Sequence, residues 1–328
     1  MKIPPDYIIT PEILNLLAKI ESLRLYFESF PVKPDLKIKL QRISLLKSSL
    51  YSARIEGNSL TLEDVNNTQQ IRDKQKKIEV FNILEALRYL EESTQMKSTL
   101  DQDLILKLHS IVMKDLSKIS GSFRIVPSAI FNQAGAAVYA TPLPEKISDL
   151  ISKLLDFANN KADYPVIQSV LTHLIFEKIH PFIDGNGRVG RLLIWAVIRL
   201  KNYNFPIFIP AEEYIENNRS DYYYHLDNGL SETGDYIKFM LEAFAASGEK
   251  IKNELLAEME KKTEVILPPR QEEILAIIKD HRNVFFNFIK RRFYRVPSRT
   301  LSYDLKKLVE KDLVIKVGKT RGSFYRAK

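Results

Sequence analysis

The sequence predicts a mainly α-helical protein that ends in a small domain of three helices and a β-hairpin. Apolar residues recur at helical spacing through most of residues 11–265, interrupted at proline- and glycine-rich stretches. A Pro268-Pro269 pair then stops the helical pattern, and the composition becomes strongly basic towards the C-terminus. The chain has no internal repeat of about 20–50 residues, which excludes a solenoid.

The composition is that of an ordinary globular protein. Of the 328 residues, 45% are hydrophobic and 27% are charged, which allows a sizeable core and two or three domains. No apolar run approaches the ~18 residues of a membrane span, and the N-terminus lacks a signal-peptide layout. The absence of cysteine excludes disulfides and suits a reducing compartment. We therefore expect a cytoplasmic protein with no membrane partner.

The first predicted domain, residues 1–100, contains a helix with a polar end. From Leu36 to Glu56 the apolar residues follow approximately helical spacing, and Gly57-Asn58 supplies a C-terminal stop. Taken alone, Glu56 at the end of this helix would be a solvated carboxylate.

The second predicted domain, residues 101–266, contains the stretch in which we expect the chemistry. Residues 180–191 read His-Pro-Phe-Ile-Asp-Gly-Asn-Gly-Arg-Val-Gly-Arg, which places a base, a carboxylate, three glycines and two arginines close together. A helical pattern from Val170 to Glu177 precedes this stretch, and a second apolar helix, Leu192 to Ile198, follows it. The stretch is therefore predicted to lie in a helix-loop-helix.

Such a loop can hold a polyphosphate, because glycines let backbone N–H groups approach an anion and a helix N-terminus favours negative charge. Arg188 and Arg191, three apart on a helix, share a face and offer guanidinium groups to successive phosphates. Asp184 suits a magnesium ion that also carries phosphate oxygens. His180, with an ordinary pKa near ~6.5, is the candidate general base.

Two other interpretations of this stretch explain less. Gly185 to Gly190 also matches the G-x-G-x-x-G dinucleotide fingerprint, but that fingerprint requires a preceding strand, and here a helix precedes it. A tight glycine turn with solvated arginines would not account for so many converging side-chain roles.

Residues 180–191 resemble the signature of the Fic family, His-Pro-Phe-x-[Asp/Glu]-Gly-Asn-Gly-Arg-x-x-Arg, with every fixed position filled. The resemblance implies a helical enzyme that transfers AMP from ATP to a Ser, Thr or Tyr hydroxyl of a target protein, with Mg²⁺. It implies His180 as the base, Asp184 as the metal ligand and Arg191 as the contact to the γ-phosphate. Gly187 stands where the related Doc-type kinases carry lysine, which favours AMP transfer over phosphate transfer.

The segment from Asn218 to Leu226 resembles the family's Asn-Arg-x-x-Tyr-Tyr segment, whose aromatic rings line the adenine pocket. Without the resemblance, tyrosines on a helix are more often packing residues. The nucleotide-binding residues that the resemblance implies are Asp184, Gly185, Asn186, Gly187, Arg188, Val189, Gly190, Arg191, Tyr222 and Tyr223.

Residues 52–57, Ser-Ala-Arg-Ile-Glu-Gly, resemble the inhibitory motif of Fic proteins, [Ser/Thr]-x-x-x-Glu-[Gly/Asn], of the class whose inhibitory helix is N-terminal. The resemblance implies a brake formed by Ser52, Glu56 and Gly57. A Glu56 carboxylate paired with Arg191 would deny that arginine to the γ-phosphate.

Residues 121–133 indicate a turn followed by a short extended ribbon, closed by prolines at 142 and 144. The equivalent hairpin of Fic proteins is the flap, which would hold the target as an added strand. The commonest flap has a glycine pair where Phe131-Asn132 stands, and a plain surface hairpin is the alternative. The flap residues implied are Ile130, Phe131, Asn132 and Gln133.

The third predicted domain, residues 267–328, resembles a winged helix-turn-helix. We expect three helices, of which the third runs from Arg299 to Lys311 after a capping Ser298, and then a hairpin. Residues 287–328 hold 13 lysines and arginines against 3 acidic residues, a net charge of +10, whereas the whole chain carries +8. The candidates for DNA contact are Arg299, Lys306, Lys307, Lys319 and Arg321.

The sequence thus favours a protein adenylyltransferase that is autoinhibited by Glu56 and modifies a target protein and itself. Its expected partners are ATP, the target and, through the third domain, duplex DNA; protein contact or homo-oligomer formation by that domain stays open. Removal of AMP from a modified protein is the alternative within the family. A DNA-binding regulator with a nucleotide-sensing core is the alternative outside it.

Overall fold

The computed structural model describes residues 1–66, 73–96, 99–131, 137–161, 164–260, 267–281, 283–318 and 323–328. The chain divides into two compact units, Met1–Leu255 (unit 1) and Leu256–Lys328 (unit 2), each with its own hydrophobic core. Unit 1 holds the first predicted domain and most of the second. The described part of the chain contains no helix with the length and apolarity of a membrane span.

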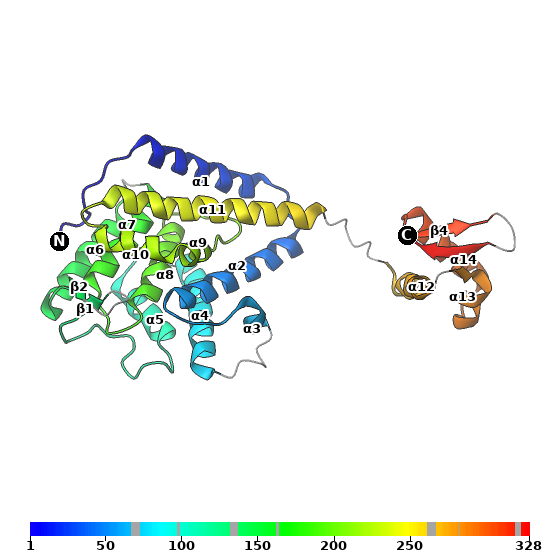
Figure 1. The fold of residues 1–328 in the computed structure, drawn as a ribbon, viewed down its shortest axis with the longest axis horizontal. Helices are drawn as coiled ribbons and strands as arrows, with labels where there is room; N and C mark the ends of the chain where they lie inside the picture. The colour runs from blue at the N-terminus through cyan, green and yellow to red at the C-terminus, as the bar shows by residue number, and fades with distance from the viewer. Residues whose placement is uncertain are drawn as a thin grey trace. The chain divides into compact units, whose positions relative to one another are not determined.

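Unit 1 is mainly helical, as predicted, with one β-hairpin (Figure 1). Its elements are α1 (Pro11–Ser29), α2 (Pro34–Ile55), α3 (Leu62–Asn66), α4 (Lys74–Met96), α5 (Gln102–Val112), β1 (Ala129–Phe131), β2 (Ala137–Ala140), the short 3₁₀ helix η1 (Pro144–Lys146), α6 (Ile147–Asn159), α7 (Pro165–Ile179), α8 (Asn186–Leu200), α9 (Ala211–Asn217), α10 (Arg219–Asn228) and α11 (Thr233–Glu260).

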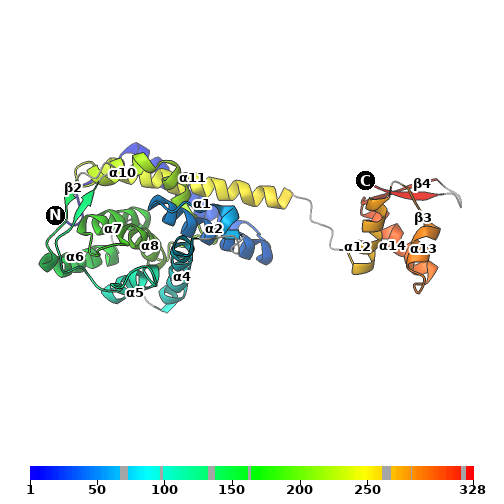
Figure 2. The same cartoon turned by 60° about the horizontal axis from the view of Figure 1, so that its bottom comes forward.

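Helices α7 and α8 form the buried centre of unit 1 and pack against each other (Figure 2). Every residue of α7 from Val166 to Ile179 is buried, and α8 is buried over most of its length. Helices that are apolar on nearly all sides are expected in the interior of a domain. The loop between them, residues 180–185, is therefore carried by two helices of the buried core.

The helix that follows this loop starts earlier than expected. The apolar pattern predicted a helix from Leu192 to Ile198, whereas α8 begins at Asn186 and includes Gly187 and Gly190. These two glycines do not make turns. A Cβ added at Gly187 would lie 2.3 Å from Glu56 Oε1, and one added at Gly190 would lie 2.3 Å from Glu177 Oε1. At both positions a carboxylate from another segment therefore occupies the space that a side chain would need.

Helix α2 brings the predicted inhibitory residues to the start of α8. It packs against α4, α9 and α8, and it ends at Ile55 with Glu56 as its C-cap. Gly57 follows with φ +100°, a left-handed conformation that favours glycine after a helix. The predicted helix and its stop are thus confirmed.

The hairpin of unit 1 pairs β1 with β2 in antiparallel register, with Ile130 opposite Tyr139. This confirms the predicted extended ribbon. Asn132 and Gln133 lie outside the described residues, as does the side chain of Phe131.

Unit 2 contains the three predicted helices and the predicted hairpin. Its elements are α12 (Pro269–Asp280), β3 (Val284–Phe285), α13 (Phe286–Arg292), α14 (Ser298–Glu310), β4 (Val314–Val317) and β5 (Phe324–Ala327). The strands form an antiparallel sheet in the order β3-β5-β4. Strand β3 was not expected, because two residues are too few to show an alternating pattern. Ser298 is the first residue of α14 and not its cap; Pro297 occupies the cap position without a side-chain hydrogen bond.

Candidate active site

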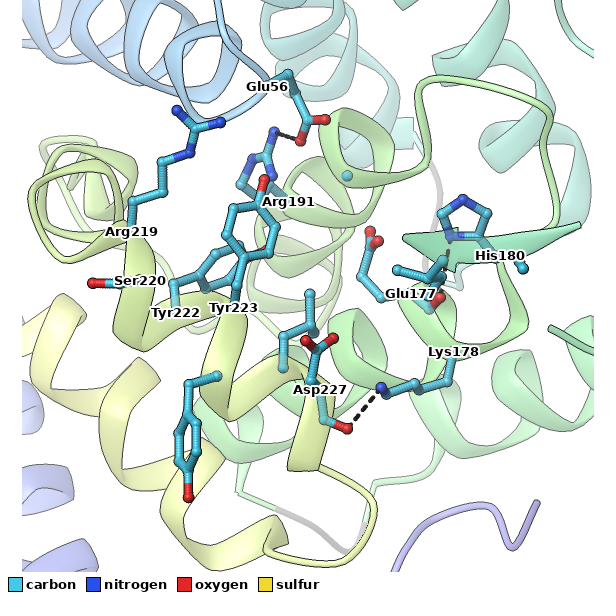
Figure 3. A pocket seen from close by; sticks show the side chains of 15 residues that line it. Glu56, Glu177, Lys178, His180, Arg191, Arg219, Ser220, Tyr222, Tyr223 and Asp227 are labelled. Carbon is cyan, nitrogen blue, oxygen red and sulfur yellow. Dashed lines mark hydrogen bonds and ion pairs between the residues drawn. The ribbon is translucent and has the colours of Figure 1, made fainter. Parts of the chain in front are cut away.

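A pocket of about 770 Å³ lies in unit 1 beside the loop between α7 and α8 (Figure 3). Its walls come from the end of α2, strand β1, the facing ends of α7 and α8, and helix α10. Of the predicted site residues, it brings together Glu56, Ile130, His180, Gly187, Arg191, Tyr222 and Tyr223. Those that surround the pocket without lining it are Ser52, Gly57, Asp184, Gly185, Asn186, Arg188, Val189 and Gly190.

His180 ends α7 in a left-handed conformation with φ 49°, which turns its side chain into the pocket. Its Nδ1 lies 3.3 Å from the carbonyl oxygen of Glu177. Since a carbonyl only accepts, Nδ1 carries the proton and Nε2 is the basic nitrogen. Burial lowers the pKa of His180, against the opposing effect of the Glu177 carbonyl, so the imidazole is neutral at pH 7.

Arg124 holds the backbone of His180 in place. Its Nε donates to the His180 carbonyl oxygen at 2.8 Å, and its other nitrogens donate to the carbonyls of Val126 (2.8 Å) and Pro142 (2.6 Å) and to Thr141 Oγ1 (3.0 Å). Arg124 is 2% exposed, and burial lowers its pKa. The sequence contained no signal for this role, because a single arginine in a loop does not reveal which carbonyls it will meet.

The loop that leads into α8 is braced from within. The side-chain amide of Asn186 donates to the carbonyl of Phe182 and accepts from its N–H, both at 2.9 Å. Gly185 has φ +82°, and a Cβ there would lie 2.7 Å from Met113 Sδ. The loop therefore presents its backbone in one conformation before any ligand arrives.

His109 supports the same loop from α5. Its Nε2 donates to the Asp184 carbonyl oxygen at 3.0 Å, its Nδ1 accepts from the Gly121 N–H at 2.8 Å, and its ring stacks on Phe182 with centroids 3.7 Å apart. Burial lowers the pKa of His109, which keeps it neutral in this arrangement. His109 is thus a buried support of the loop.

Arg188 and Asp184 form an ion pair outside the pocket. Arg188 Nη2 lies 2.7 Å from Asp184 Oδ1, and Nη1 lies 2.7 Å from Glu79 Oε1 on α4. Glu79 in turn accepts from Asn58 Nδ2 at 2.8 Å. Although Arg188 and Arg191 are three residues apart, their guanidinium groups go to partners on different helices. Sequence reasoning missed Glu79, which lies about a hundred residues earlier and belongs to no motif.

Asp184 is the candidate metal ligand. Its side chain is 64% exposed, and its Oδ1 also accepts from the Gly185 N–H at 2.6 Å. In the described part of the chain no three His, Cys, Asp or Glu residues are grouped as metal ligands. Such a site fits Mg²⁺, which is commonly held by one or two carboxylates together with substrate phosphates and water.

Arg191 is buried against α2. Its Nε donates to Ser52 Oγ, and its Nη2 donates to the Ser52 carbonyl oxygen and to Glu56 Oε1, each at 2.9 Å. Burial is the largest single effect and would lower the pKa of Arg191, but Glu56, Tyr222 and Tyr223 together outweigh it and the pKa is raised. The expected Glu56–Arg191 pair is thus present. Glu56 remains 30% exposed, so the pair is open to the pocket on the Glu56 side.

Tyr222 and Tyr223 of α10 form part of the pocket wall. Tyr222 is buried, and its hydroxyl lies 3.1 Å from His173 Nε2, while Tyr236 contacts His173 Nδ1 at 2.6 Å. Burial lowers the pKa of His173 to about 3, so this histidine is a neutral positioning group. Tyr223 donates to the Ile55 carbonyl oxygen at 3.1 Å, which joins α10 to the end of α2.

The pocket is also lined by Glu177 and Lys178 of α7, which were not predicted. Glu177 is 5% exposed, and burial raises its pKa to about 8. Lys178 donates from Nζ to the Asp227 carbonyl oxygen at 3.0 Å and lies 4.6 Å from the centre of the Tyr139 ring. The sequence did contain one signal for these two residues. Two adjacent charged residues in an otherwise apolar helix require a partner or a function.

The predicted DNA-contact residues of unit 2 differ in their surroundings. Arg299 is exposed at the start of α14. Lys306 and Lys307 both lie near Glu310, at 3.7 and 2.7 Å, so part of their charge is already neutralised. Lys319 and Arg321 lie outside the described residues.

Comparison with known proteins agrees with this geometry. Residues 99–198, which include α7, the loop and most of α8, match the sequence model of the Fic/DOC family. A relative from Drosophila willistoni, named protein adenylyltransferase Fic, is 30% identical over 200 residues, which cover 58% of this chain and 37% of the relative. The relative of the same name from Drosophila virilis is 28% identical over 58% of this chain and 38% of its own length. The chain thus spans little more than a third of the curated relatives that it matches.

Solved structures show the same fold. A Fic family protein from Desulfovibrio desulfuricans G20 aligns with a TM-score of 0.81 at 23% identity, over 99% of this chain and 98% of that chain. Fic-1 from C. elegans aligns with a TM-score of 0.63 at 19% identity, over 75% of this chain and 73% of that chain. The family match over residues 99–198, the curated relatives and the fold thus agree in their similarity to the Fic/DOC family.

Proposed function

We propose that the pocket of unit 1 transfers AMP from ATP to a Ser, Thr or Tyr hydroxyl of a target protein, and of the chain itself. The observation that carries the proposal is the meeting of a neutral His180, Gly187 at the start of α8, and Arg191 in one pocket. A base and an anion-binding helix N-terminus are the two groups that this transfer needs. The similarity to proteins named protein adenylyltransferase supports the same reaction.

In the proposed reaction the hydroxyl oxygen of the target forms a bond to the α-phosphorus. The bond from that phosphorus to the oxygen that bridges to the β-phosphate breaks, and pyrophosphate leaves. His180 Nε2 takes the hydroxyl proton, because Nδ1 is occupied by the Glu177 carbonyl. Arg124 fixes the His180 backbone, so the base does not need to reorient when the substrate binds.

The phosphates would lie along the start of α8. Residues 186–188 form the first turn of this helix and supply its N-terminal N–H groups, and Arg191 would contact the γ-phosphate. Asp184 would hold Mg²⁺ together with phosphate oxygens, and the ion would supply neutralisation of phosphate charge. Arg188, tied to Asp184 and Glu79, would orient that carboxylate. Tyr222 and Tyr223 would form the wall for adenine, and Ile130 would face the target.

The Glu56–Arg191 pair would act as a brake on this reaction. Arg191 directs its Nε and Nη2 donors to Ser52 and Glu56, so a γ-phosphate must displace the carboxylate to gain the arginine. The Glu56 carboxyl also lies within 2.3 Å of the position a Cβ would take at Gly187, where the phosphates are expected. With Glu56 in place, a triphosphate would bind weakly or with its α-phosphate misaligned.

The test is self-labelling from ATP that carries the label on its α-phosphate. We expect slow labelling of the wild type, labelling at least about tenfold faster in Glu56→Gly, and none in Glu56→Gly with His180→Ala. Labelling that survives His180→Ala would refute the assignment of the base. If Glu56→Gly labels no faster than the wild type, the brake is wrong. Loss of label from a pre-labelled protein in the presence of wild type would indicate AMP removal instead.

We further propose that unit 2 is a winged helix that binds duplex DNA. Three helices, a hairpin and the strand order β3-β5-β4 support this interpretation, as does the net charge of +10 in residues 287–328. The exposed basic residues Lys290, Arg291 and Arg292 on α13, together with Arg299, supply unneutralised charge of the kind that phosphate contacts require. Such a unit would place a protein-modifying enzyme at a DNA site.

A further inference from the structure

We propose that Glu177 acts as a neutral acid that donates a hydrogen bond to a phosphate oxygen of the bound nucleotide. The inference rests on the proposed function, because it requires a nucleotide phosphate in the pocket of unit 1. It adds a phosphate-binding residue to those that the helix N-terminus and Arg191 supply.

The first argument is the position of the carboxyl group. Glu177 lies in the last turn of α7, is 5% exposed, and lines the pocket. Its side chain lies so close to α8 that a Cβ at Gly190 would be 2.3 Å from its Oε1. In Figure 3 the carboxyl group points into the space between Arg191 and His180, where the phosphates are expected.

The second argument is an unsatisfied hydrogen-bonding atom. Among the described residues, Glu177 Oε1 has no partner. Buried polar atoms nearly always have one, and a sealed oxygen without a partner disfavours the ionised form of the carboxyl group more than the neutral form. Arg191 is close, but its hydrogen bonds from Nε and Nη2 go to Ser52 and Glu56 and not to this oxygen.

The third argument is the charge of the surroundings. The titratable groups around Glu177 are Arg191 on α8, Glu56 at the end of α2, His173, Lys178 and His180 on α7, Tyr222 on α10 and Tyr236 on α11. Burial is the main effect and raises the pKa of Glu177 to about 8, with Arg191 and Lys178 opposing it and Glu56 adding to it. Phosphate charge would replace that of Glu56 and favour the protonated form as well.

A protonated carboxyl group and a phosphate suit each other. The acid donates its O–H to a phosphate oxygen, and ionised donors or acceptors make the stronger hydrogen bonds. An ionised Glu177 would have no proton to donate and would repel the phosphate. Nucleotide binding and protonation of Glu177 are therefore linked.

The test is titration calorimetry of full-length protein with an ATP analogue whose α–β bridge is a methylene group, in the presence of Mg²⁺. The background is Glu56→Gly, so that Arg191 is available. At pH 9, two buffers with different ionisation enthalpies report the number of protons taken up. We expect uptake approaching one proton per nucleotide, and affinity about tenfold or more weaker at pH 9 than at pH 7.

The decisive variant is Glu177→Gln, whose amide imitates the neutral acid and does not titrate. In the Glu56→Gly background it should bind within about threefold of its parent at pH 7, lose the proton uptake and keep its affinity at pH 9. Glu177→Ala should bind more weakly at both pH values. Glu212→Gln is the matched control, because Glu212 is also a buried acid with a raised pKa, about 7, but does not line the pocket.

The proposal would be overturned if proton uptake persists in Glu177→Gln. It would also be overturned if Glu177→Gln binds the analogue as weakly as Glu177→Ala does at pH 7. The outcome is separable from that of the proposed function. If label is transferred from ATP but analogue binding takes up no proton, only the role of Glu177 is refuted. If analogue binding takes up a proton but no label is transferred, only the AMP transfer is refuted. An analogue that binds at no pH would overturn both.

Discussion

At the residue scale, the site depends on which charges are buried and with whom. Arg191 is neutralised by Glu56 and held by Ser52, whereas Glu177 avoids a charge by keeping its proton. His180 is a base at pH 7 because burial disfavours its protonated form. Each of these states follows from desolvation, which costs more for an unpaired ion than for a paired or neutral group.

The pKa of His180 predicts where activity begins as the pH rises. Since the pKa is lowered, the imidazole stays neutral below its ordinary value near ~6.5, and the base remains active there. We expect the acid limb of kcat/KM for self-labelling in Glu56→Gly to have its midpoint below pH 6.5. Glu56→Gln should give the same limb, because both variants remove the charge that raises the pKa of His180. A midpoint at or above 6.5 in both variants would contradict the buried-base assignment.

At the scale of elements, the loop between α7 and α8 is positioned mainly by segments far from it in the sequence. The turn after α5 supplies Arg124, which binds the end of α7 and the segment after β2 at the same time. Helix α4 supplies Glu79 for Arg188, and α2 supplies Ser52 and Glu56 for Arg191. The loop and the start of α8 are therefore held by three neighbouring parts of unit 1.

Arg124 allows this support to be tested. In Arg124→Lys, a single ammonium cannot reach all four acceptors, and buried carbonyls lose their partner at about 1–3 kcal/mol each. We expect unfolding free energy to fall by more than about 2 kcal/mol and kcat for self-labelling to fall about tenfold or more, with little change in the KM for ATP.

The matched control for this prediction is Arg199→Lys. Arg199 is on α8 and pairs with Glu91 at 2.9 Å, outside the pocket lining. Arg199→Lys should leave kcat unchanged. It should change the unfolding free energy by no more than about 1 kcal/mol. Normal kcat in Arg124→Lys would show that the loop keeps its geometry without the guanidinium group.

At the scale of the whole molecule, charge is divided unequally between the two units. Residues 287–328 carry +10 while the chain as a whole carries +8, so residues 1–286 are slightly acidic. A basic segment joined to a nearly neutral unit is suited to holding that unit at a polyanion, and binding of this kind weakens steeply with salt.

We expect the full chain to bind duplex DNA with a log–log salt dependence that becomes less steep by about one unit in Arg299→Ala. Lys307→Ala is the comparison, and its effect should be smaller because Lys307 already pairs with Glu310 at 2.7 Å. The measurement is fluorescence anisotropy of a labelled duplex across a salt series. Absence of binding at low salt would favour protein contact as the role of unit 2.

Part of this molecule could be predicted from local patterns. Helical spacing predicted most helices, because burial on one face leaves a period that is visible in sequence. The twelve residues 180–191 predicted the site, because a loop that holds phosphate needs its glycines, base and arginines within a few positions. The pairing of Glu56 with Arg191 was expected from the resemblance of residues 52–57 to a known motif, and it is present.

The tertiary structure decided what local patterns do not contain. Arg188 and Arg191 have the same chemistry and neighbouring positions, yet one meets α4 and the other α2. Gly187 and Gly190 looked like turn residues, but they lie inside α8 because carboxylates from α2 and α7 occupy the space of their missing side chains. The roles of Arg124 and Glu177 likewise depend on groups from other elements and on burial. Sequence by itself determined which chemical groups this chain brings to the loop; packing determined their partners and charges, because desolvation and contact arise only when distant segments meet.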